Sequence, residues 1–232
     1  MLNVLRLLLP LFLVSLSTTL NAAPSNDPAS TLALDQRDAK ALAGLVEDLN
    51  RIKTIQGSFV QFAVDQRGVS IQESRGSFKA KRPDMFYWRT DAPLEQEIYS
   101  NARFVTVYDP DLEQATIQKN TQQGDHTPAV LFSGDTTRIG ALYQVQETGE
   151  GGNVAQYVLT PRSKDSLFEK LRIRFEGTQL TEMRLRDSLG QETTIRFVYT
   201  EINLELDDAL FEAKLPEGTD IIKDIPVNQN VE

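Results

Sequence analysis

The chain is 232 residues long, contains no cysteine and has a formal net charge of −9 at pH 7. Without cysteine it has no disulfide bond and no metal site or catalytic centre built on a thiolate. The acidic excess argues against nucleic-acid binding, and the length suits one domain of ordinary size with a large core.

The first 22 residues have the pattern of a secretory signal peptide. Arg6 is their only charge, and an apolar run from residue 7 to residue 16 follows it. We place the cleavage after Ala22 and expect residues 23–232 to form a single exported domain. A transmembrane anchor is the alternative, but the apolar run is short, and the residues that follow are polar and include proline.

Residues 37–52 predict the first helix, because apolar side chains recur there at spacings of three and four. Asp38 is the expected N-cap and Gly57 the expected end of this helix. Residues 23–34, rich in Ala, Pro, Ser and Asn, are expected to form a frayed leader. The apolar face of the helix comprises Leu42, Leu45, Val46, Leu49 and Ile52.

Apolar and polar residues alternate along most of the remaining chain, which predicts a mainly β protein with antiparallel strands. About eleven strands would form a sheet large enough to curl into a barrel or to split. Helices are few: Thr127 and Pro128 begin a second one, and a short turn is expected at 207–210. The strands are expected at 57–63, 71–81, 85–90, 95–100, 103–108, 114–118, 143–148, 154–160, 171–175, 180–187 and 193–199.

Few residues suit catalysis or metal binding. His126 is the only histidine, which excludes zinc sites built from His and Cys ligands, and no nucleophile can be assigned to it as a general base. No glycine loop for phosphate binding occurs. Residues 108–114 bring three acids together, which suits either a calcium site or, as we favour, a tight turn. We therefore expect no enzyme activity, no cofactor and no metal ion.

Arginines point outward from the last three expected strands, at positions 172, 174, 184, 186 and 196. They could face an acidic partner or lipid headgroups, although we favour a solvated face balanced by neighbouring acids. A large curled sheet with few helices and little chemistry is also a common way of holding an apolar ligand.

Several motifs follow one another in the order and spacing of one family. They are GSF (57–59) with Gln61, GSFKAKRPDMFYW (76–88), YDPDLEQAT (108–116), TPAVL (127–131), LTP (159–161) and FEAKLPEGTDII (211–222). With this series the chain resembles the LolA family, periplasmic carriers of lipoproteins. One departure is SNARF (100–104), where the family usually has an Asp-Gly type turn; Asn101 is expected to take the positive φ there.

The resemblance implies an incomplete, half-open antiparallel β-barrel covered by a lid of helices, with acyl chains held between them. It implies that Arg82 hydrogen-bonds to the lid and helps to set how easily it opens; the alternative is that Arg82 is simply extended before Pro83. Side chains alternate between the two faces of a strand, and this alternation places the four positions that the sheet contributes to the lipid side on one face. The implied lipid side comprises Phe78, Ala80, Phe86 and Trp88 from the sheet, and Leu42, Leu45, Val46, Leu49, Val130 and Leu131 from the lid.

The resemblance also implies the partners. Acylated lipoproteins would be the cargo, an ATP-driven inner-membrane transporter would load them, and the outer-membrane receptor LolB would accept them. We expect a periplasmic monomer. The alternative function is a periplasmic domain that senses lipids or lipoproteins; LolB itself is disfavoured because it is lipidated and this chain has no cysteine.

Overall fold

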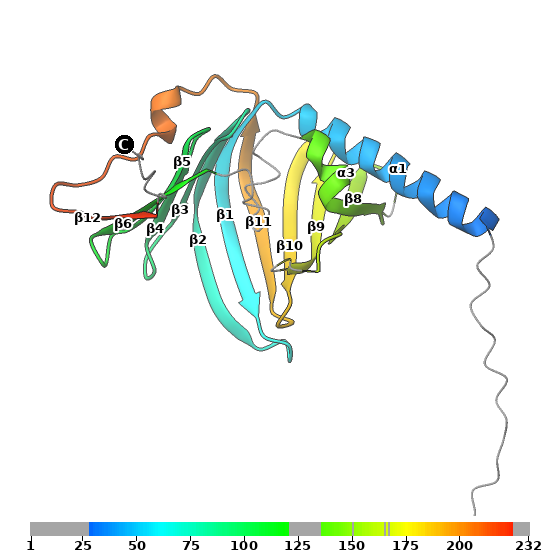
Figure 1. The fold of residues 1–232 in the computed structure, drawn as a ribbon, viewed down its shortest axis with the longest axis horizontal. Helices are drawn as coiled ribbons and strands as arrows, with labels where there is room; N and C mark the ends of the chain where they lie inside the picture. The colour runs from blue at the N-terminus through cyan, green and yellow to red at the C-terminus, as the bar shows by residue number, and fades with distance from the viewer. Residues whose placement is uncertain (1–27, 121–135, 150, 165, 167, 225–232) are drawn as a thin grey trace, which may run out of the picture.

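The computed structural model describes residues 28–120, 136–149, 151–164, 166 and 168–224 (Figure 1). The predicted signal peptide, His126, and the predicted second helix with Val130 and Leu131 lie outside these residues. In the described part of the chain, no helix has the length and apolar character needed to cross a membrane.

One curled sheet of twelve strands dominates the fold (Figure 1). The strand order is β12-β6-β5-β4-β3-β2-β1-β11-β10-β9-β8-β7, so the end strands β12 and β7 do not pair and the sheet stays open. The eleven predicted strands are present. The strands are β1 Thr54–Val64, β2 Ser70–Lys81, β3 Met85–Thr90, β4 Gln96–Ser100, β5 Phe104–Asp109, β6 Gln114–Lys119, β7 Tyr143–Glu147, β8 Val154–Pro161, β9 Phe168–Glu176, β10 Gln179–Asp187, β11 Glu192–Ile202 and β12 Asp220–Asp224.

The central pairing joins two meanders. β1 pairs with β2 on one side and with β11 on the other, both antiparallel, so β1–β6 and β7–β11 become one sheet. The twelfth strand, β12, was not predicted; it pairs parallel with β6 at the edge. A parallel edge strand of five residues leaves no periodicity long enough to be recognised in the sequence.

The first helix, α1, runs from Pro28 to Asn50 along one end of the sheet and projects beyond it (Figure 1). The predicted N-cap at Asp38 and the frayed leader over 28–34 are therefore wrong: strong helix formers continue the helix back to Pro28, a favoured first residue. Asp38 lies inside α1, where its Oδ2 accepts a hydrogen bond from Gln144 Nε2 at 2.5 Å. The other described helices are short: η1 Thr136–Arg138, α3 Ile139–Leu142 and η2 Asp208–Phe211.

The end of α1 also differs from the prediction. Gly57 does not terminate the helix but lies in β1 opposite Phe78. A Cβ at Gly57 would be 3.0 Å from the Tyr199 carbonyl, so the glycine serves close strand packing. Asn203 holds the connection instead: its Oδ1 accepts from Lys53 N at 2.8 Å and its Nδ2 donates to Arg51 O at 3.0 Å.

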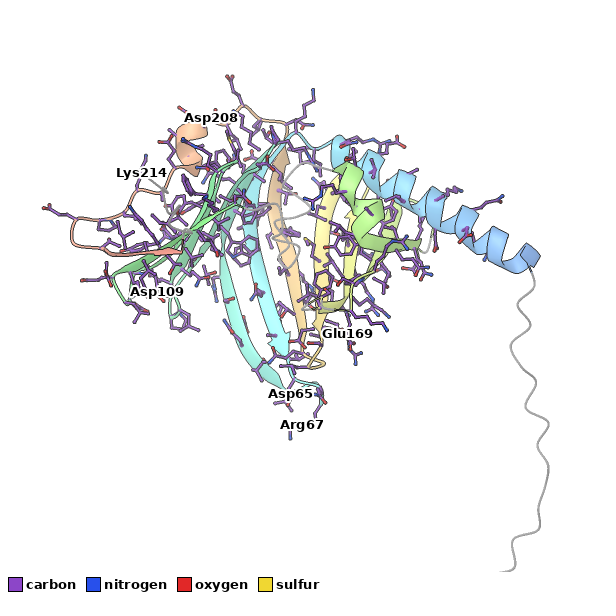
Figure 2. All side chains as sticks on the ribbon, viewed as in Figure 1. Asp65, Arg67, Asp109, Glu169, Asp208 and Lys214 are labelled. Carbon is purple, nitrogen blue, oxygen red and sulfur yellow. The ribbon has the colours of Figure 1, made fainter. Side chains whose placement is uncertain are left out.

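Both faces of the sheet are covered around β3. The inner face, which α1 shares, carries the main core, including Phe86 and Trp88. The segment 203–215, which contains η2 with Asp208 and then Lys214, lies beside the β3–β6 end of the sheet (Figure 2). It covers the outer face there: Lys81 Nζ donates to Leu206 O at 2.8 Å, and Phe211 is 1 % exposed. Consequently β3 lacks the alternation of a strand with one face in water.

Candidate functional site

The four predicted sheet positions lie side by side on the inner face. In the register of β2 and β3, Phe78 is opposite Trp88 and Ala80 is opposite Phe86. All four are buried and belong to one apolar cluster. Their strand neighbours Lys79 and Tyr87 point to the outer face, as period-two geometry requires.

Phe59 of β1 completes an aromatic stack that sequence reasoning missed. Its ring centroid is 3.7 Å from that of Trp88, with the planes inclined by 24°. Phe78 and Phe86 each lie 6.0 Å from Trp88. Gly76, opposite Phe59, leaves the room: a Cβ there would be 2.8 Å from Phe59 Cζ. The sequence feature that could have revealed this stack is a glycine in β2 that lies opposite an aromatic residue across the β1–β2 hairpin.

From the helix, Leu45 and Leu49 enter the same cluster and are 0 % and 2 % exposed. Leu42 is half-buried and packs against it. Val46 is half-buried but outside the cluster, because it lies one position round the helix from Leu45. The buried helix and sheet positions of the predicted lipid surface therefore belong to one packed apolar cluster in this structure.

The inner face continues beyond the aromatic stack as a half-exposed apolar row. Trp88 is opposite Ile98 of β4, and Ile98 is opposite Val107 of β5. Ile98 and Val107 are both only half-buried. The row therefore joins the packed core to a more accessible part of the same face.

Arg82 joins the β2–β3 turn to the segment directly after α1. Its Nε donates to Ile52 O at 2.8 Å, and its main-chain N donates to Lys53 O at 2.9 Å. Burial lowers the pKa of the guanidinium from its ordinary value. A guanidinium nonetheless stays charged at neutral pH and acts as a donor only.

A second polar contact holds α1 to the sheet. Tyr157 of β8, 3 % exposed, donates its hydroxyl hydrogen to Asp48 Oδ2 at 2.9 Å. Burial and then this hydrogen bond raise the pKa of Tyr157 above its ordinary value. No sequence signal marks this pair, because the two residues are 109 positions apart.

Two local predictions can be compared with the turns. The acid-rich stretch 108–114 forms the tight turn between β5 and β6: Asp109 Oδ1 accepts from Leu112 N at 3.1 Å, and Glu113 has a φ of 50°. The predicted positive φ at Asn101 is wrong. Asn101 instead shapes its turn through Oδ1, which accepts from Arg103 N and Phe104 N, both at 2.9 Å.

Comparison with known proteins assigns the family. Residues 50–214 match the family described as "Outer membrane lipoprotein carrier protein LolA". The chain belongs to the LolA family. An outer-membrane lipoprotein carrier protein of Azotobacter vinelandii is 41 % identical over 84 % of this chain and 94 % of its own length. One from Pseudomonas paraeruginosa is 39 % identical over 95 % of this chain and 100 % of its own length.

The LolA match extends from the end of α1 through η2 and stops before β12. Among solved structures, an uncharacterized conserved protein from Thermus thermophilus superposes with a TM-score of 0.52 at 13 % identity. That superposition covers 80 % of this chain and 98 % of the Thermus chain. At this identity it supports the fold alone, an open sheet of the same general form.

Proposed function

We propose that this LolA-family chain is a periplasmic carrier rather than an enzyme. It accepts outer-membrane-destined lipoproteins from an ATP-driven transporter of the inner membrane, shields their acyl chains against the inner face of the sheet and passes them to the receptor LolB. Residues 1–22 act as the signal peptide that exports it. The relatives in A. vinelandii and P. paraeruginosa bear the name of such carriers.

One observation carries the proposal: an apolar row runs across the inner face from Trp88 through Ile98 to Val107, and among the described helices α1 covers the part of this face near β7. Leu45 and Leu49 of α1 fill space on this face that acyl chains would take. Displacement of α1 would then exchange one apolar contact for another. Such an element has two states whose balance depends on cargo.

The free energy of burying acyl chains explains why cargo would move directly between proteins. Burying acyl chain is worth about 0.8 kcal/mol per methylene, so chains totalling about forty carbons represent roughly 30 kcal/mol against water. Cargo held in this way cannot pass through solvent. The carrier needs to bind it only slightly better than it binds its own helix. Arg82, through Ile52, would help to set that balance.

Incubation of the mature protein with spheroplasts that hold newly made lipoprotein tests the proposal. We expect lipoprotein to appear in the soluble fraction in a complex with the carrier, and to transfer to membranes that contain LolB. Absence of any complex, with the loading transporter present and the protein folded, would overturn it. A stable complex that never transfers would favour a sensing domain.

A matched pair of variants locates the cargo surface. Val107→Asp places a charge in the half-exposed row of the inner face, and Val60→Asp places the same charge on the outer face of β1. Both valines are half-buried, so the cost to folding should be similar. We expect Val107→Asp to abolish the soluble complex and Val60→Asp to retain it. Equal activity of the two variants would contradict the inner-face assignment.

A further inference from the structure

The outer face of β7–β10 holds a depression of ≈ 560 Å³. Four of the residues that line it are cations and one is an acid: Lys170, Arg172, Arg174, Arg184 and Glu182. Their strand neighbours Ile173 and Met183 point into the core on the α1 side. The depression therefore lies on the opposite side of the sheet from α1, away from the proposed cargo surface.

The cations are set directly opposite one another across β9 and β10. Arg172 pairs in register with Arg184, and Lys170 with Arg186. Like charges in directly opposed positions destabilise an antiparallel sheet. The arrangement is thus unfavourable for the isolated protein.

Acidic neighbours offset only part of this charge. Arg184 lies 3.2 Å from Glu182 and 3.4 Å from Glu192, and Arg174 lies 3.2 Å from Glu176. Outside the lining, Arg186 lies 3.6 Å from Glu169. Within the described residues, no carboxylate oxygen lies within 4.0 Å of a side-chain nitrogen of Arg172 or Lys170, so neither forms an ion pair there. The lining of the depression therefore keeps a positive excess, in a chain whose net charge is −9.

We infer that this depression is a docking site for an acidic segment of a partner protein. Guanidinium groups bind carboxylates in a planar, two-point geometry, and Arg172 has this capacity unused. Neutral Gln146 and Gln156 also line the depression, and their side-chain amides can hydrogen-bond to a peptide backbone. The opposed cations, unfavourable alone, become complementary once carboxylates lie between them.

Shape favours a peptide over a membrane surface. The side chains of Arg174 and Arg184 are only 35 % and 33 % exposed, within a hollow. A flat layer of headgroups contacts protruding groups, whereas a carboxylate side chain can enter the hollow. Because the site faces away from α1, docking here leaves the inner face free, and the inference stands whether or not that face binds acyl chains.

A fluorescent hexaglutamate peptide serves as the probe, with anisotropy measured at low and at physiological salt. We expect wild-type protein to bind it and Arg172→Glu to weaken binding about tenfold or more. Arg172→Glu also replaces a like-charge pair with an opposite-charge pair opposite Arg184, so its unfolding midpoint should equal or exceed that of wild type. Arg75→Glu, the same change on the outer face of β2, is the matched control and should bind as wild type does.

Three outcomes would overturn the inference. The first is failure of the wild-type protein to bind the peptide at low salt. The second is an equal loss of binding in Arg172→Glu and Arg75→Glu, which would show only general electrostatic attraction. The third is sedimentation with phosphatidylglycerol vesicles that depends on Arg172 while hexaglutamate does not bind, which would assign the depression to a lipid surface.

Discussion

The indole of Trp88 stacks on the ring of Phe59, with centroids 3.7 Å apart, across the strand that separates β3 from β1. Both side chains are buried on the face that α1 shares. The contact is possible only because Gly76 of β2 carries no side chain between them. Since Trp88 is the only tryptophan, its fluorescence reports on this part of the core.

A triacylated lipopeptide should change the emission of Trp88, because acyl chains entering the inner face alter the surroundings of the stacked indole. Titration with the lipopeptide, followed by emission spectra, measures this directly. The same peptide without acyl chains is the control and should have no effect. An unchanged spectrum in a protein that demonstrably binds the lipopeptide would place the acyl chains elsewhere.

Gly76→Ala should destabilise the fold by about 3 kcal/mol or more, because overpacking cannot be relieved beside backbone. The added Cβ would lie 1.8 Å from the Arg89 carbonyl oxygen. Urea unfolding of Gly76→Ala and of the neighbouring Ser77→Ala measures the difference. Ser77→Ala removes only a half-buried hydroxyl on the other face and should destabilise the fold far less. Similar losses of unfolding free energy in the two variants would refute the close approach of Gly76 to the Arg89 carbonyl oxygen.

Arg82→Lys should loosen the end of α1 while keeping the charge. It removes the Nε donor to Ile52 O, and a hydrogen bond of this kind contributes about 1 kcal/mol. Its loss should raise the equilibrium constant for local opening at the end of α1 about fivefold. Amide hydrogen exchange over residues 45–53 measures that opening. Arg103→Lys, in an exposed turn, should leave exchange there unchanged. If exchange is identical in all three proteins, Arg82 has no part in holding α1.

Tyr157→Phe should destabilise the protein by about 1 kcal/mol at neutral pH by removing the hydrogen bond to Asp48. Because the pKa of Tyr157 is raised in the folded state, folding retains its proton. This contribution is complete below the ordinary tyrosine pKa of about 10 and is lost as pH rises through the raised value. Urea unfolding at pH 7, 9 and above 10 measures the difference in the free energy of unfolding between wild type and Tyr157→Phe. We expect this difference to narrow only at the highest pH; a difference that disappears between pH 7 and 9 would contradict the prediction.

Phe211→Ala should release the segment that covers the outer face of β3. Phe211 is 1 % exposed, so truncation should cost about 3–5 kcal/mol. Its neighbour Leu210 is 40 % exposed, and Leu210→Ala should cost much less. Chemical unfolding of both variants, with limited proteolysis over 203–219, measures the effect. Equal stability of the two variants would show that the segment is not anchored through Phe211.

The eleven strands and the shared face of Phe78, Ala80, Phe86 and Trp88 were predictable, because residue alternation within a strand is a local property. The start of α1 was not, because Asp38 resembles an N-cap while the residues before it also favour a helix. Where local preferences are of similar strength, the sequence does not determine the residue at which a helix begins. Packing of the helix against the sheet then decides between the possible starting residues.

By itself, the sequence determined the class of the fold, the faces of its strands and the motifs that mark the LolA family. Only the tertiary structure decided that β1 pairs with β11, that Phe59 stacks on Trp88, that Tyr157 holds α1 through Asp48, and that opposed arginines line one outer depression. The physical reason is that periodicity says which way a side chain points. It carries no information about which distant strand or helix lies opposite, because that depends on how the whole sheet curls.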